Sequence, residues 1–235
     1  MNGFFDIPSD LQHSYPGLIA LHMQEALVPV LVGLLLALPI GLLCVHNDWL
    51  YPPVLWTSTV LYAIPSIAFF VVLIDYTGLT QLTVMIPLCL YSLVVLVPAV
   101  VDGIRSVPEE TNAAAAAMGI GPVRRYFQVQ LPIAVPAIMA GLRVATASSI
   151  SLASVGSLIG NQGALGNLLT TAMLYHRPHL AVTSVVTTAV LAIAVDALLV
   201  LLRRLLTPWQ PPSARKARRL ASTIPDAART VEGVS

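Results

Sequence analysis

The chain has 235 residues, of which 57% are hydrophobic and only 10% are charged, and its formal net charge is +1 at pH 7. Soluble domains carry about 25% charged residues, so this composition excludes an ordinary soluble domain, and the near-zero charge gives no reason to expect a nucleic-acid partner. Uncharged runs that exceed the roughly 20 residues needed to cross a bilayer recur along the chain and indicate an all-α polytopic membrane protein.

Five membrane-spanning helices are predicted from these runs, at about 22–45, 51–74, 79–101, 133–159 and 180–202. Residues 1–21 carry Asp6 and Asp10 but no positively charged start, so they do not resemble a signal peptide. We expect a transmembrane domain over 22–207 and a disordered basic tail over 208–235. The tail either contacts anionic membrane lipid or has no role.

The basic residues are distributed unevenly around these spans. Ten of the twelve lie either between the third and fourth spans or after the fifth. Loops rich in arginine and lysine stay on the cytoplasmic side of the membrane. The distribution predicts a plasma (inner) membrane protein with its C-terminus in the cytoplasm and its N-terminus outside.

A short polar segment between the third and fourth spans has the signals of a separate cytoplasmic helix. Ser106 and Glu109 have capping-box spacing, and Glu109 and Glu110 suit a helix N-terminus. Five alanines over 113–117 favour helix, and Gly119 is a natural stop. We predict a helix at about 108–120, which is either a docking surface for another protein or a plain connector.

The spacing within this segment resembles the EAA signature of ABC importer permease subunits. In the signature, Glu-Ala-Ala is followed after three residues by Gly, and after nine more by Ile-x-Leu-Pro. The matching positions here are Ala113, Ala114, Ala115, Gly119, Val129, Leu131 and Pro132. Alanine replaces the signature glutamate at position 113, which leaves open whether Glu109 or Glu110 makes the usual contact with the ATPase.

The resemblance extends over roughly residues 20–207 and is to the branch that transports glycine betaine, carnitine, choline and proline. It rests on IPSIAFF (64–70), LYSLVVLVPAVVDGI (90–104), LPIAVPAIMAGLRVA (131–145) and LIGNQGALGNLL (158–169). It implies a five-helix type I importer core, in which the 108–120 helix couples to a dimer of ABC ATPase subunits. It further implies a second permease, identical or homologous, and an extracellular solute-binding protein.

The same resemblance implies that this chain is not an enzyme and binds no cofactor, because ATP and Mg²⁺ belong to the partner ATPase. The absence of a G-x4-G-K-[ST] phosphate loop from the sequence agrees with this expectation. The alternatives are a permease for another small solute, such as an amino acid, and a secondary transporter. Coupling-ion sites and inverted repeats, which a secondary transporter needs, are not evident.

The fourth span holds the other candidate site residues. Arg143 is a charge within the membrane, where charges are usually functional. Ser148 and Ser151 line a polar solute path or bond to their own helix. Gly156, Gly160, Gly163 and Gly166 form an outer gate or permease seam, or serve ordinary close packing.

Two further expectations concern charges and aromatic residues. Asp196 lies two turns before Arg203 on the same helical face, which favours local neutralisation. Tyr62, Phe69, Phe70 and Tyr91 are scattered along the chain and give no sign of an aromatic cage for quaternary ammonium compounds. Carboxylates are too dispersed to suggest an active site, so a membrane enzyme is also disfavoured.

Overall fold

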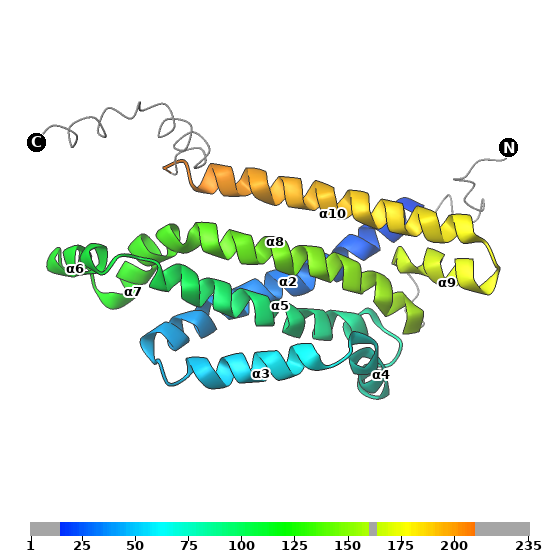
Figure 1. The fold of residues 1–235 in the computed structure, drawn as a ribbon, viewed down its shortest axis with the longest axis horizontal. Helices are drawn as coiled ribbons and strands as arrows, with labels where there is room; N and C mark the ends of the chain where they lie inside the picture. The colour runs from blue at the N-terminus through cyan, green and yellow to red at the C-terminus, as the bar shows by residue number, and fades with distance from the viewer. Residues whose placement is uncertain (1–14, 160–163, 210–235) are drawn as a thin grey trace, which may run out of the picture.

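A computed structural model describes residues 15–159 and 164–209, and all regular structure in these ranges is helical. Figure 1 shows an elongated bundle of roughly parallel and antiparallel helices. In chain order the α-helices are α2 (Tyr15–His46), α3 (Tyr51–Ala63), α4 (Ser66–Thr77), α5 (Gln81–Arg105), α6 (Glu109–Ala117), α7 (Pro122–Arg125), α8 (Leu131–Gly156), α9 (Gly166–Leu174) and α10 (Pro178–Leu206). A π-helical turn, η1 (Tyr126–Gln130), joins α7 to α8, and a 3₁₀ turn, η2 (Ser157–Ile159), follows α8.

The core of the bundle is formed by α2, α5 and α8. Its buried side chains include Val30 from α2, Leu96 from α5 and Leu142 from α8. Small residues bring these helices close together, because a Cβ at Gly41 would overlap the Val100 side chain, and one at Gly141 would overlap Ala99. Close approach of this kind is typical of membrane helices, which gain stability from contact rather than from exclusion of water.

The second predicted span is broken into two helices. α3 and α4 meet at an angle of 92° around Ile64 and Pro65, so the span predicted over 51–74 is a bent pair of helices rather than one continuous helix. Proline lacks a backbone N–H and disfavours the helical conformation in the residue before it. Ile64 accordingly has φ −70° and ψ 123°, which is an extended conformation.

Within the described residues, four segments are long and apolar enough to cross a membrane: α2, α5, Pro122–Ile159 and α10. The bent α3–α4 pair makes a fifth if it is counted as one span. The chain is therefore a multi-pass membrane protein, as predicted. α2 begins at Tyr15, so the end of the predicted 1–21 segment is helical, whereas positions 210–235 of the predicted tail lie outside the described residues.

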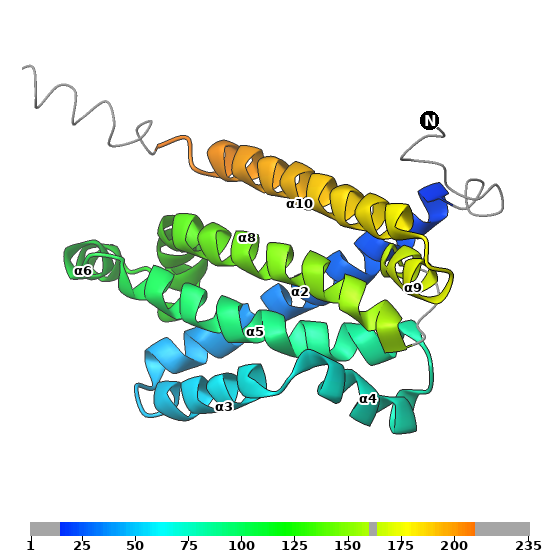
Figure 2. The same ribbon diagram turned by 45° about the vertical axis from the view of Figure 1, so that its right-hand side comes forward.

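The two ends of the bundle differ. Figures 1 and 2 both show α6 projecting beyond one end, beside α7, whereas α4 and α9 lie at the other end. α10 lies along one side of the bundle and is buried only near its start, at Leu180, Thr183 and Ser184. Most of α10 therefore has its apolar surface free for lipid or another subunit.

Candidate docking helix and translocation site

The start of α6 differs from the predicted capping box. Pro108 occupies the N-cap position, and the Ser106 hydroxyl donates to the carbonyl of Gly103 at 2.7 Å. The capping-box prediction is therefore wrong, because the last turn of α5 offers this hydroxyl a nearer acceptor. Glu109 and Glu110 do lie exposed in the first turn, where their charge complements the helix dipole.

The end of α6 is the glycine stop that the sequence predicts. Gly119 has φ +78°, the left-handed conformation that suits glycine. Its N–H donates to the Ala116 carbonyl at 2.9 Å, and the Ile120 N–H donates to the Ala115 carbonyl at 3.1 Å. This pair of bonds is a Schellman motif, which ends the helix sharply and turns the chain back toward the bundle.

Beyond its first turn, the exposed surface of α6 is smooth and apolar. Ala113, Ala114, Ala116 and Ala117 are exposed, whereas Ala115 faces the bundle and is only 2% exposed. Beyond the alanines, Met118 is 73% exposed, and Val123 and Phe127 are also exposed. Alanines that permit close backbone approach, next to large exposed apolar side chains, are features of a surface that another protein covers.

The residues after Gly119 hold α6 in place. The Gln130 side-chain amide donates to Asn112 Oδ1 at 3.0 Å, and the Tyr126 hydroxyl donates to the Leu38 carbonyl at 3.1 Å. Leu131 and Pro132 begin α8 and are half-buried, with Leu131 packed against the core. The spacing from α6 to this Leu-Pro pair therefore helps to set the position of α6, and the exposed alanines form its surface.

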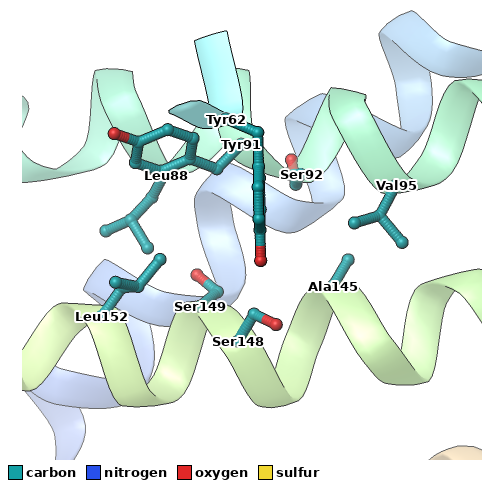
Figure 3. A pocket seen from close by; sticks show the side chains of 9 residues that line it. All are labelled: Tyr62, Leu88, Tyr91, Ser92, Val95, Ala145, Ser148, Ser149 and Leu152. Carbon is teal, nitrogen blue, oxygen red and sulfur yellow. The ribbon is translucent and has the colours of Figure 1, made fainter. Parts of the chain in front are cut away.

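The break between α3 and α4 creates a small aromatic pocket (Figure 3). Tyr62 and Tyr91 meet edge to face with ring centroids 6.1 Å apart, and Phe69 meets Tyr91 in the same manner at 6.0 Å. The Tyr91 hydroxyl donates to the Ile64 carbonyl at 3.0 Å. Three of the aromatic residues that are scattered in the sequence are thus gathered in space, a cluster that the sequence did not predict.

The fourth-span hydroxyls divide between two environments. Ser148 is half-buried and lines the aromatic pocket, opposite the tyrosines, together with Ser149. Ser149 also donates to the Ala26 carbonyl at 2.7 Å, which ties α8 to α2. Ser151 is exposed and is not among the residues that line this pocket, so the structure does not bring Ser148 and Ser151 together.

Arg143 forms a two-point ion pair with Asp196. Its Nε lies 2.6 Å from Asp196 Oδ1, and its Nη2 lies 2.7 Å from Oδ2. The expected neutralisation of Asp196 by Arg203 on its own helix is therefore wrong. The pair joins α8 to the middle of α10, where both charges lie within membrane-spanning helices.

Gly156 and Gly166 serve packing within the chain. A Cβ at Gly156 would lie 2.6 Å from a methyl of Val84 on α5, and one at Gly166 would overlap Ser157 Oγ and the Ser154 carbonyl. These contacts support the packing interpretation of the two glycines. Gly160 and Gly163 lie outside the described residues.

Replacing Gly166 with alanine is expected to lower the stability of the purified permease. The Cβ would overlap the Ser154 backbone, which cannot move without displacing the end of α8. Overpacking of this kind costs about 1–3 kcal/mol, measurable as a lower Tm. The matched control is Gly17→Ala, because a Cβ at Gly17 meets nothing within 4 Å. Equal Tm values for the two variants would contradict the packing role.

Sequence reasoning missed two buried polar residues in α2. His22 and Glu25 lie one turn apart, and both are fully buried. They precede Ala26, the residue whose carbonyl receives the Ser149 hydroxyl. Ionisable residues inside a membrane segment are often functional. The sequence did offer a signal for Glu25, because this carboxylate directly precedes a long uncharged run.

Together these features define a class: a helical membrane protein with a short alanine-rich helix that projects from one end of the bundle. The profile of the family described as "Binding-protein-dependent transport system inner membrane component" matches residues 30–210. The chain therefore belongs to this family.

Its relatives include transport permeases. The chain is 28% identical to the choline transport system permease protein OpuBB of Bacillus subtilis (strain 168), over 80% of this chain and 86% of that protein. It is 32% identical to the osmoprotectant import permease protein OsmW of Salmonella typhimurium, over 80% and 89% of the two chains. It shares the fold of a chain in inward-facing structures of the MetNI methionine ABC transporter, with a TM-score of 0.76 and 18% identity over 86% of this chain and all of that one.

Proposed function

We propose that this chain is the transmembrane permease subunit of an ATP-driven ABC importer and forms part of the translocation pathway for osmoprotectants. The solutes are of the glycine betaine, choline, carnitine and proline type. The observation that carries the proposal is similarity over four-fifths of the chain to permeases named for choline and osmoprotectant transport. The exposed alanine surface of α6 supports it, because an importer needs such a contact with its ATPase.

The proposed partners follow from this role. A dimer of ABC ATPase subunits docks on α6 and binds ATP and Mg²⁺, so this chain performs no catalysis and binds no cofactor itself. A second permease, identical or homologous, completes the pathway, and an extracellular solute-binding protein delivers the solute. Membrane lipid covers the remaining apolar surface.

The proposed orientation places α6 and the end of α10 in the cytoplasm and the start of α2 outside. Arg105, Arg124 and Arg125 flank α6, and Arg203 and Arg204 lie in the last turn of α10. Figure 1 shows α6 and the C-terminal end of α10 toward the same end of the bundle, so these basic residues belong to elements at one end. Basic residues favour the cytoplasmic side.

Reconstitution of the permease with its ATPase and binding protein tests the proposal. We expect ATP-dependent uptake of labelled choline, glycine betaine, carnitine or proline into proteoliposomes, and co-purification of the ATPase with tagged permease. Uptake confined to an unrelated solute class, such as methionine or nitrate, would refute the osmoprotectant assignment. Uptake without ATP, with no co-purifying ATPase, would refute the importer itself.

A further inference from the structure

The aromatic pocket beside the α3–α4 break has the chemistry of a cation site. Its tyrosine rings come from α3 and α5, and they face the Ser148 and Ser149 side chains of α8 (Figure 3). The side chains that line it carry no formal charge. Most of the lining is apolar, and the groups in it that can attract a cation without forming an ion pair are the aromatic faces and the serine hydroxyl oxygens.

The rings are set at nearly right angles. The Tyr62 and Tyr91 planes are inclined by 80°, and the Phe69 and Tyr91 planes by 77°. Walls at right angles let one cation contact more than one aromatic face, which is how quaternary ammonium groups are recognised. Phe69 packs on Tyr91 without lining the pocket itself. We propose that Tyr62 and Tyr91 form the aromatic wall of a transient site for the ammonium head of the solute inside the permease.

Tyr91 is the fixed part of this wall. It is only 6% exposed, and its hydroxyl donates to the Ile64 carbonyl at the helix break. Ile64 precedes a proline and is extended, so its carbonyl takes no part in a continuous helix. The break that bends the span therefore also orients the Tyr91 ring.

Tyr62 is the exposed part of this wall. It is 60% exposed and lies near the end of α3, a helix that packs mainly on α5. In this conformation the pocket has room for about one water molecule. An ammonium head therefore enters only when Tyr62 moves away from Ser148. The site is closed in this conformation and open in another state of the transport cycle.

An uncharged site suits passage better than a carboxylate would. Conduction requires binding that is favourable enough to admit the solute and weak enough to release it. A buried carboxylate would hold a quaternary ammonium ion tightly, whereas aromatic faces give modest attraction. The inference rests on the proposed function and names the part of the permease that contacts the solute's cationic head.

Choline transport by the reconstituted complex, with saturating binding protein, tests the site. We expect Tyr62→Leu to slow choline uptake about two- to thirtyfold, while Tyr62→Phe retains most of it. Trp56→Leu is the matched control, because Trp56 is an exposed aromatic residue of α3 that does not line this pocket. It should transport choline like the unmodified protein.

Fluorinated phenylalanines at position 62 separate cation binding from packing. Successive fluorine atoms weaken the negative ring face with little change in shape, so uptake should fall step by step from phenylalanine to its trifluoro form. A flat series, or normal uptake by Tyr62→Leu, would overturn the site while leaving the proposed function intact. If the unmodified complex transports no quaternary ammonium compound, the proposed function fails and the site with it.

Discussion

Replacing Gly119 with tryptophan is expected to abolish solute uptake while the permease remains inserted in the membrane. Gly119 closes the Schellman motif at φ +78°, where a residue with a side chain costs roughly 1–2 kcal/mol. A Cβ at this position meets nothing within 4 Å, so the indole would project into open space beside α6. It would therefore disturb a docked partner more than the permease's own fold.

Two variants serve as controls for this prediction. Gly119→Asn should retain most uptake, because asparagine tolerates the left-handed conformation and is small. Ala113→Glu should also be tolerated, because Ala113 is exposed and glutamate is a good helix former. The measurements are uptake, the amount of permease in the membrane fraction, and the amount of ATPase that co-purifies. Unchanged uptake by Gly119→Trp would argue against docking at α6.

Removing either member of the Arg143–Asp196 pair is expected to reduce the amount of folded permease several-fold. Each charge is held by two hydrogen bonds to the other, at 2.6 and 2.7 Å. Truncating one partner leaves an uncompensated charge within a membrane-spanning helix, which is unfavourable. The pair also holds the middle of α10, which is otherwise buried only near its start.

The double variant Arg143→Met with Asp196→Leu provides the decisive comparison. It removes both charges together, so it should accumulate to a higher level than either Arg143→Met or Asp196→Leu alone. The measurements are membrane-fraction abundance and the yield of monodisperse purified protein. The pair would not hold α10 to α8 if the single variants accumulated to the level of the unmodified protein. The same conclusion would follow if the double variant accumulated to no higher level than the single variants.

Local sequence signals predicted the long helices and α6, but they did not predict α9 or the division of the second span into α3 and α4. Helix ends were predicted in some places and not in others. Gly119 ends α6 as expected, because the left-handed turn is a property of that residue and its neighbours. The capping box failed because Ser106 found the Gly103 carbonyl, a competing local bond of similar quality. Pro65 by itself could have predicted the break at Ile64 and Pro65. Prolines elsewhere, however, lie inside continuous helices such as α5.

The candidate site was less accessible to sequence reasoning, because its contacts join distant segments. Asn112 and Gln130 meet across 18 residues and hold α6, yet neither belongs to the recognised signature positions. The pairing of Tyr62 with Tyr91 depends on how α3 packs against α5. Apolar helices of similar composition could pack in several ways, so composition does not say which aromatic residues meet.

The sequence by itself determined the membrane class, the approximate spans and the presence of an alanine-rich helix between the third and fourth of them. These follow from hydrophobicity, helix propensity and glycine conformation, which act over a few neighbouring residues. Only the tertiary structure decided that Arg143 pairs with Asp196, 53 residues away, and that three aromatic residues gather beside a bent span. The physical reason is that such contacts depend on which helix faces meet. Small residues such as Gly41 and Gly141 determine which faces meet, because they let a neighbouring helix approach closely.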